Sequence, residues 1–163
     1  MMAGTEVTEG RTTVGDVGRA DLAGVQQHAT VAEAAKLMRD LDVGSAAVFD
    51  RANLVGIVTE RDVMFAALDG ADLEQTPVTD YMTRQPATIW VDADISQAAL
   101  AMCTLHARHL PVVDGANVVG MVSSRDLMEA LYDHRMPGGR TKRTGGFGTL
   151  WRKRPRIADI WKL

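Results

Sequence analysis

Apolar residues follow two different periods along this chain, and the two periods alternate. Between residues 30 and 41 they recur every three or four positions, which is the spacing of the buried face of a helix. Between residues 46 and 58 they form two short continuous runs around a polar turn, which predicts a β-hairpin. Thr30 and Glu33 predict where the helix begins, because their side chains can satisfy each other's free backbone N–H groups. With a short strand before this segment and a second helix after it, the predicted order is strand, helix, strand, strand, helix.

The whole pattern returns 64 residues later. Residues 12–67 align with residues 76–131 without a gap, and 20 of the 56 aligned pairs are identical. The most similar stretches are GIVTERD at residues 56–62 and GMVSSRD at residues 120–126. A repeat of roughly 60 residues buries too little surface to be comfortably stable alone. We therefore expect an α/β (α+β) fold in which two β-α-β-β-α repeats pack sheet to sheet about a pseudo-twofold axis.

Composition and length limit the class of protein. The 163 residues are 46% hydrophobic but only 5% aromatic, so aliphatic side chains and methionine must fill the core. No stretch reaches the roughly 20 apolar residues of a membrane-spanning helix, and the polar residues 1–11 lack the apolar core of a secretion signal. A single cysteine excludes an internal disulfide framework. We therefore expect a soluble, cytoplasmic protein.

The charge of the chain is unevenly distributed. Residues 134–163 hold nine Lys or Arg against one acid, a net charge of +8, so the −3 of the whole chain leaves −11 on residues 1–133. The basic tail also contains Trp151 and Trp161. It could bind nucleic acid by stacking, rest on an anionic membrane surface, or fold back on the acidic body of its own or a second subunit. We favour the last arrangement, because it needs no external partner, and do not expect nucleic acid to be bound.

The repeated segments resemble the CBS domain, the regulatory module named after cystathionine β-synthase. The resemblance covers residues 12–132, and nothing outside them resembles a catalytic domain, so we expect a stand-alone CBS pair. The residues that carry the resemblance are, in the first copy, Val14, Asp16, Val17, Ala34, Ala35, Met38 and residues 56–62, and in the second copy residues 78–83, 86–89, 108–113 and 120–126.

Each repeat places a hydroxyl and an aspartate where a strand gives way to a helix. The pairs are Thr59 with Asp62 and Ser123 with Asp126. Such pairs can simply cap the helix, contributing about 1 kcal/mol each. In CBS pairs similar to this one, however, the aspartate holds the ribose of an adenine nucleotide and the phosphate lies near the hydroxyl, at a helix N-terminus that favours anions. Because the pairs recur at matched positions, we favour ligand binding over capping alone.

Four further residues complete the expected site. Arg108 and His109 precede a strand of the second copy, where basic residues of related CBS pairs contact phosphate; the alternative is a solvated pair at the end of a helix. Thr88 and Ile89 begin the first strand of the second copy and are expected near the base. The first copy has Gly44-Ser45 in place of Arg108-His109, so we expect two unequal sites.

These features predict a non-catalytic sensor that binds AMP, ADP or ATP in the cleft between the repeats and needs no cofactor. Cys103, His106 and His109 follow one another at three-residue steps, but they drift around a helix and lack a fourth ligand, so we expect no metal site. The alternative function is a structural or protein-interaction module with empty clefts, whose basic tail binds a partner or nucleic acid.

The resemblance also implies an assembly, because related CBS pairs commonly form flat dimers through their helices. We therefore expect a homodimer with a twofold interface. The predicted divisions of the chain are a polar N-terminal segment (1–11), the first repeat (12–68), a linker (69–75), the second repeat (76–133) and the basic tail (134–163).

Overall fold

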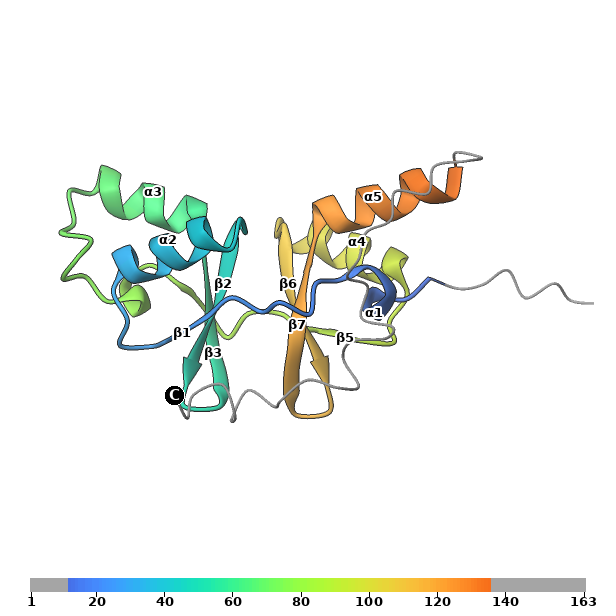
Figure 1. Cartoon of the computed structure of the whole chain (residues 1–163), viewed down its shortest axis with the longest axis horizontal. Coiled ribbons are helices and arrows are strands. Elements are labelled where there is room, and N and C mark those ends of the chain that lie inside the picture. Colours follow the sequence, from blue (N-terminus) through green and yellow to red (C-terminus); the bar gives the residue numbers. More distant parts are fainter. Residues whose placement is uncertain (1–11, 136–163) are drawn as a thin grey trace, which may run out of the picture.

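The computed structural model describes residues 12–135, which form two similar lobes side by side (Figure 1). Lobe 1 consists of β1 (Gly24–Gln26), β2 (Ser45–Asp50), β3 (Asn53–Thr59), β4 (Thr83–Arg84), α2 (Val31–Asp40) and α3 (Glu60–Leu68). Lobe 2 consists of β5 (Ile89–Trp90), β6 (His109–Asp114), β7 (Asn117–Ser123), α4 (Ile95–Leu105) and α5 (Ser124–Arg135). Each repeat begins with one short helix, α1 (Val14–Val17) or the 3-10 helix η1 (Val78–Asp80).

Capping side chains begin the helices at the predicted positions. The Thr30 hydroxyl accepts a hydrogen bond from the Glu33 backbone N–H at 3.2 Å, and the Glu33 carboxylate accepts one from the Thr30 N–H at 2.8 Å. Asp94 caps α4 in the same way: its carboxylate accepts a hydrogen bond from the Ser96 N–H at 2.8 Å. Because these donors would otherwise lack partners, the caps fix the first turn of both helices.

The two sheets share one pattern of pairing. In lobe 1, β1 pairs parallel with β2, and β2 pairs antiparallel with β3. Helix α2 connects β1 to β2. In lobe 2, β5, β6 and β7 repeat these relations. Val48 lies opposite Gly56, and Val112 lies opposite Gly120, with an irregularity directly after each valine. The sequence repeat is therefore a repeat of strand register as well.

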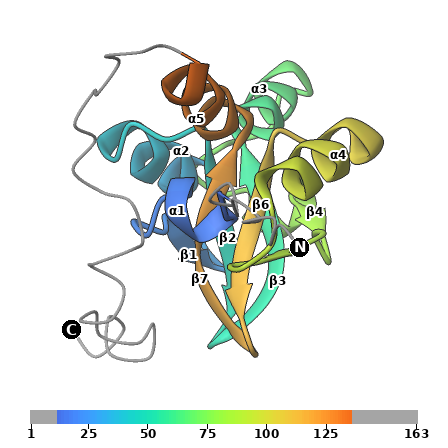
Figure 2. The same ribbon diagram turned by 90° about the vertical axis from the view of Figure 1, so that its right-hand side faces the viewer.

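The leading segment of each repeat packs in the lobe of the other repeat. Residues 12–17 belong to the first repeat, yet the Gly15 N–H donates to the Val91 carbonyl at 2.7 Å and the Val14 N–H donates to the Ala93 carbonyl at 2.8 Å. The Val14 side chain is fully buried in the core of lobe 2. Figure 2, with lobe 2 toward the viewer, shows α1 lying against this lobe.

The leading segment of the second repeat packs in lobe 1 in the same way. Val78 of η1 is fully buried in the core of lobe 1, and its N–H donates to the Ala29 carbonyl at 2.8 Å. β4 then adds a fourth strand to the lobe 1 sheet, beside β3. Met82 comes so close to β3 that a Cβ on Gly56 would collide with its sulfur. The sequence repeat did not predict this exchange, because a linear alignment holds no information on which copy a segment contacts.

A third apolar cluster joins the two sheets face to face, which confirms the predicted sheet-to-sheet packing. Phe49 is its largest fully buried side chain, at 1% exposed, and Gly24 lies so close to the Phe49 ring that a Cβ there would be only 3.0 Å away. The backbone of Arg19 also bridges to Met121 of β7 through two hydrogen bonds of 2.8 and 3.0 Å. The buried members of the cluster are Ala47, Phe49 and Ile57 from lobe 1 and Val118 and Met121 from lobe 2.

The predicted tail arrangement, with Trp151 and Trp161 docked on the acidic body, lies outside the described residues, and so does the N-terminal segment 1–11. Within residues 12–135, no helix combines the length and the apolar content that crossing a membrane requires.

We expect Phe49→Ala to lower the free energy of unfolding of the whole pair by about 3–5 kcal/mol, because it empties the contact between the sheets. Urea denaturation at fixed protein concentration measures this change. Trp90→Ala removes another aromatic ring, but from an exposed position on β5, and should cost less than about 1 kcal/mol. Equal losses in the two variants would contradict a central role for the inter-sheet cluster.

Candidate ligand-binding site

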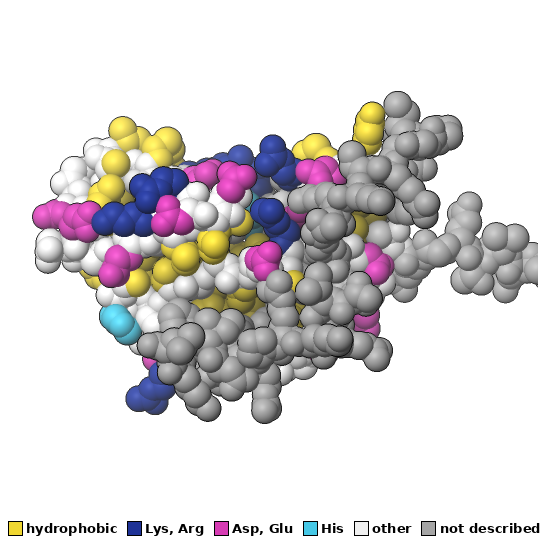
Figure 3. All heavy atoms as spheres, in the orientation of Figure 1, with side chains coloured by type: hydrophobic (Ala, Val, Ile, Leu, Met, Phe, Trp, Pro, Cys, Tyr) yellow, Lys and Arg dark blue, Asp and Glu magenta, His cyan; other side chains and the backbone are white. Residues whose placement is uncertain are grey.

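A cavity of about 900 Å³ lies between the lobes, at the end of the sheets where the strands lead into α3 and α5. Figure 3 shows basic and acidic side chains gathered together between the lobes on this side of the molecule. The chain that leads from α1 in lobe 2 to β1 in lobe 1, residues 18–23, runs along the cavity and contributes Arg19, Asp21 and Ala23. The exchange of leading segments therefore helps to build the site.

The wall from lobe 1 contains an apolar surface beside the charged residues Arg39, Asp42 and Glu60. It is formed by one face of α2, by the segment that leads into β2, and by the first turns of α3. The flat faces of a purine base can pack against this surface at little cost in desolvation. The apolar residues lining the cavity are Ala23, Ala35, Met38, Val43 and Val63, with Met121 from lobe 2.

The wall from lobe 2 is polar, and the Ser123–Asp126 pair stands in it. The Ser123 N–H and hydroxyl both donate to Oδ2 of Asp126, at 2.8 and 2.6 Å, and the Asp126 N–H donates to the Ser123 hydroxyl at 3.3 Å. Asp126 is only 4% exposed. The capping interpretation of this pair is therefore correct, whatever else the pair does.

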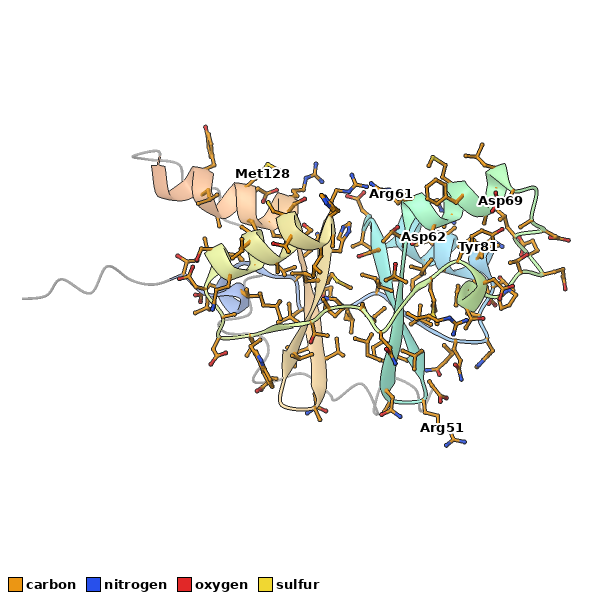
Figure 4. All side chains as sticks on the ribbon, turned by 180° about the vertical axis from the view of Figure 1, so that it is seen from behind. Arg51, Arg61, Asp62, Asp69, Tyr81 and Met128 are labelled. Carbon is orange, nitrogen blue, oxygen red and sulfur yellow. The ribbon has the colours of Figure 1, made fainter. Side chains whose placement is uncertain are left out.

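Thr59 and Asp62 form the same cap in lobe 1. The Thr59 N–H and hydroxyl donate to Oδ2 of Asp62 at 2.7 and 2.8 Å. Neither residue lines the cavity that contains Asp126. Figure 4 shows Asp62 beside Arg61 at the N-terminal end of α3, where this helix approaches the gap between the lobes. The matched pairs have matched local geometry, but only one of them faces this cavity.

The hydroxyls and the first helical N–H groups are already engaged by the protein. The Ser123 hydroxyl gives its proton to Asp126, and the Ser124 N–H donates to the Arg108 carbonyl at 2.9 Å. In lobe 1 the Glu60 N–H donates to the Gly44 carbonyl at 3.2 Å. An anionic ligand group must therefore be met chiefly by cationic side chains rather than by these helix ends.

Three arginines are the cationic side chains available to bind such an anionic group. Arg19, Arg108 and Arg125 line the cavity, and no carboxylate within residues 12–135 forms an ion pair with any of them. Arg39 lines the cavity too, but Asp40 holds its guanidinium at 2.8 Å. Guanidinium groups without partners are well suited to bind a phosphate or a carboxylate.

His109 is placed where the two lobes meet. Its Cε1 and Nε2 lie 3.4 Å from the point where a Cβ on Gly44 would stand, and Oε2 of Glu60 lies 3.3 Å from the same point. A larger residue at position 44 would push against both groups. The small Gly44-Ser45 pair of the first copy, which departs from the Arg108-His109 of the second, therefore makes room for the histidine of the opposite lobe.

Burial of the imidazole lowers the pKa of His109 below its ordinary value of 6.5, and the neighbouring Arg108 guanidinium lowers it further. The carboxylates of Asp126 and Glu60 act in the opposite direction but do not compensate. At neutral pH the imidazole is therefore uncharged in the free protein, and an anion bound beside it would favour its protonation.

The remaining residues predicted for the site lie elsewhere. Ile89 is buried in the core of lobe 2, and Thr88 is exposed just before it; neither lines the cavity. Cys103 and His106 do not line it either. Within residues 12–135 no group of three His, Cys, Asp or Glu is arranged to hold a metal ion.

Sequence reasoning missed the contributions of Arg19, Asp21, Glu60 and Arg125 to the cavity. Arg19 and Asp21 belong to the leading segment, whose exchange between lobes could not be foreseen. Glu60 offered a weak signal, because it replaces a serine of the second copy directly after the hydroxyl of the repeated motif. The two lobes thus present different charges to the cavity.

Residues 14–69 and 78–133 each match the sequence profile of the CBS domain. The chain belongs to the CBS-domain family. A 17.7 kDa protein of Acidianus ambivalens is 40% identical over 119 residues, which are 71% of each chain. The CBS domain-containing protein YhcV of Bacillus subtilis is 31% identical over 116 residues, 71% of this chain and 83% of its own.

Solved CBS pairs with bound ligands have the same fold as this chain. The CBS pair of protein MJ0100, in complex with 5′-methylthioadenosine and S-adenosyl-L-methionine, superposes with a TM-score of 0.72 at 25% identity, covering 77% of this chain and 100% of that one. The CBS protein PAE2072 of Pyrobaculum aerophilum, complexed with AMP, has a TM-score of 0.66 at 25% identity, covering 71% and 89%. The ligands of these relatives all contain adenosine.

We expect the stability of this CBS pair to fall as the pH drops below about 6.5, partly because of His109. Its pKa is lowered in the folded protein, so the unfolded chain binds the proton first, and stability present above pH 6.5 is lost as the pH falls toward the lower, folded-state pKa. Melting temperatures between about pH 7.5 and pH 5 should therefore fall less steeply for His109→Gln than for the wild type. His28→Gln, at an exposed turn after β1, is the control and should keep the wild-type slope. Parallel curves for the wild type and His109→Gln would contradict the assignment.

Proposed function

We propose that this CBS pair is a non-catalytic regulatory module of the cytoplasm that binds an adenine nucleotide (AMP, ADP or ATP) in the cavity beside Asp126. The observation that carries the proposal is the cavity itself. It joins a buried aspartate, an apolar wall and arginines without ion-pair partners within residues 12–135. These are the three kinds of surface that a ribose, a base and a phosphate require.

Asp126 is the proposed ribose ligand. Its carboxylate would accept hydrogen bonds from the vicinal diol of the ribose, while Ser123 binds Oδ2. The base then lies toward the apolar wall of lobe 1, and the phosphate lies toward Arg108 and His109. Ser123 contributes by holding Asp126 in place. We keep Thr59 and Asp62 as a second and weaker site, because the first copy supplies no Arg108 or His109.

The relatives support an adenosyl ligand without deciding which one. MJ0100 binds 5′-methylthioadenosine and S-adenosyl-L-methionine, and PAE2072 binds AMP. What these ligands share is adenosine, the portion that Asp126 and the apolar wall would recognise. Their other groups differ in charge, so residues at the polar end of each site must decide among them.

An interaction module with an empty cavity is the second candidate. One observation favours it: each hydroxyl–aspartate pair is already complete as a helix cap, so neither aspartate needs a ligand to explain its burial. In that case nucleotides would leave the melting temperature unchanged, and the regulatory output would come from protein contacts alone.

Asp126→Ala should abolish nucleotide binding, whereas Asp62→Ala should largely preserve it. The two substitutions break the same cap and should each cost about 1 kcal/mol of stability, so Asp62→Ala is a matched control for folding. Calorimetry and thermal shift with AMP, ADP, ATP, 5′-methylthioadenosine and S-adenosyl-L-methionine measure the outcome. A ligand at a hundred times its Kd should stabilise the wild type by about 2.7 kcal/mol. No stabilisation by AMP, ADP or ATP would defeat the proposal, and equal losses in both variants would contradict the assignment of the site to Asp126.

We further propose that two copies associate through α3 and α5. Figure 4 shows Met128 on the outer side of α5, where it is 64% exposed. Together with its neighbours it forms an apolar surface that a second copy could cover about a twofold axis. The large exposed apolar residues of these two helices are Met64, Phe65, Leu68, Met128, Leu131 and Tyr132.

Light scattering should give a mass of twice 17.6 kDa at micromolar concentration. Leu68→Glu with Met128→Glu should shift the mass to that of one chain, because isologous burial would bring each new carboxylate into an apolar contact. Leu100→Glu, on the exposed side of α4, is the control and should stay dimeric. A wild type with the mass of a single chain would end the dimer proposal.

A further inference from the structure

We propose that His109 links the binding of an anionic adenosyl ligand to the uptake of a proton, so that the cavity responds to acidity as well as to its ligand. This inference rests on the proposed function and concerns the regulation of the same site. It applies to a ligand that carries a phosphate, such as AMP, and not to an uncharged one such as 5′-methylthioadenosine.

His109 lines the cavity at the junction of the two lobes. It is the first residue of β6 and lies opposite Ser123 of β7 in the strand register, and both residues line the cavity. The ring also reaches the other lobe, because Cε1 and Nε2 both lie 3.4 Å from the position of a Cβ on Gly44. An anionic group bound in this part of the cavity would therefore lie near the imidazole.

Charges from both lobes act on this imidazole. Burial, and after it the Arg108 guanidinium, hold the pKa of His109 below its ordinary value of 6.5, while the carboxylates of Asp126 in lobe 2 and Glu60 in lobe 1 act in the opposite direction. The free protein therefore keeps an uncharged ring between two carboxylates that would favour its cation. The other charged residues of the cavity lining are Arg19, Asp21, Arg39, Asp42, Arg125 and Glu129.

A bound anion changes this balance in two ways. Its negative charge offsets that of the Arg108 guanidinium, and it adds to the carboxylates that favour a protonated ring. The protonated ring can then donate hydrogen bonds from both nitrogens, whereas the neutral ring donates from only one. Because the coupling between two bound species is reciprocal, the proton strengthens binding of the anion by the same factor as the anion strengthens binding of the proton.

Glu60 extends the effect of this proton across the lobes. Its Oε2 lies 3.3 Å from the same Cβ position on Gly44 that the imidazole approaches. A cation formed on His109 of lobe 2 would therefore face a carboxylate of lobe 1, and the two charges would attract each other. The second copy has Ser124 at the position of Glu60, so this carboxylate is a feature of the first copy. The proton would thus favour close approach of the two lobes around the ligand.

Nuclear magnetic resonance of the full-length chain measures the protonation of His109 directly. The imidazole signals of the four histidines are followed from about pH 5 to about pH 8.5, and His109→Gln identifies the signal of His109. In the complex with AMP, His109 should titrate at a clearly higher pH than in the free protein. Saturation with 5′-methylthioadenosine, which has no phosphate, should not raise it. A titration that AMP leaves unchanged would overturn the inference.

Calorimetric titration with AMP measures the effect on affinity. The wild type should bind AMP about three- to tenfold more tightly at pH 6.5 than at pH 8, because uptake of one proton changes affinity by at most about tenfold per pH unit. For His109→Gln the change should be less than about twofold. The phosphate of AMP itself takes up a proton near about pH 6, but this contribution is the same for both proteins and cancels in the comparison.

Glu60→Gln keeps the size of the side chain and removes its charge. It should reduce the gain in affinity on acidification, because the carboxylate that faces the protonated ring is lost. His28→Gln, at an exposed position, is the control and should keep the wild-type dependence on pH. If Glu60→Gln strengthened AMP binding equally at both pH values, the carboxylate would act on the phosphate instead, and its proposed role across the lobes would be wrong.

The failure of this inference differs from the failure of the proposed function. Parallel dependence on pH in the wild type and His109→Gln, with AMP bound by both, would refute only the link to the proton. Absence of binding of AMP, ADP and ATP to the wild type at either pH would defeat the proposed function, and this inference with it.

Discussion

The apolar contact between the two sheets is the constraint on which the rest of the molecule depends. Phe49 and its neighbours hold β2 and β3 against β7, and the distance they set decides how far apart the strand ends lie. At those ends the loops of the two lobes come close enough for His109 to reach Gly44. The cavity exists because the lobes are held together below it and diverge only where α3 and α5 begin.

The site is asymmetric although the scaffold is nearly symmetric. Matched hydrogen bonds form the two helix caps, and matched registers form the two hairpins. The differences lie in the residues that no strand or helix requires: Gly44 against Arg108, and Glu60 against Ser124. A duplicated fold can keep its core pattern fixed while the rim of the cleft diverges. One lobe thereby supplies Arg108 and Asp126, and the other supplies the apolar surface together with Glu60.

Sequence reasoning succeeded where local physics decides the outcome and failed where the outcome depends on the path of the chain. The caps at Thr30 and Asp94 were predictable, since a cap involves residues only a few positions apart. The residue with left-handed backbone conformation in the turn between β2 and β3 was not predictable in this way. It is Arg51, whose backbone N–H and carbonyl are both held by the Gln26 side chain from β1, whereas the second copy has Gly115. The position of Arg19 in the cavity was not predictable for a similar reason, because its backbone is held by Met121, a residue far away in the sequence.

The exchange of leading segments has a consequence for how such a chain can be rearranged. A cut in the linker separates the sequence into two repeats, but each piece would carry the first helix of the other lobe's core, Val14 in one case and Val78 in the other. Recombination at the linker therefore gives two lobes whose hydrophobic cores each combine residues from two different parent proteins. To transplant one intact lobe between homologues, both crossing segments must travel with the lobe they pack in, so the heritable module is the interlocked pair.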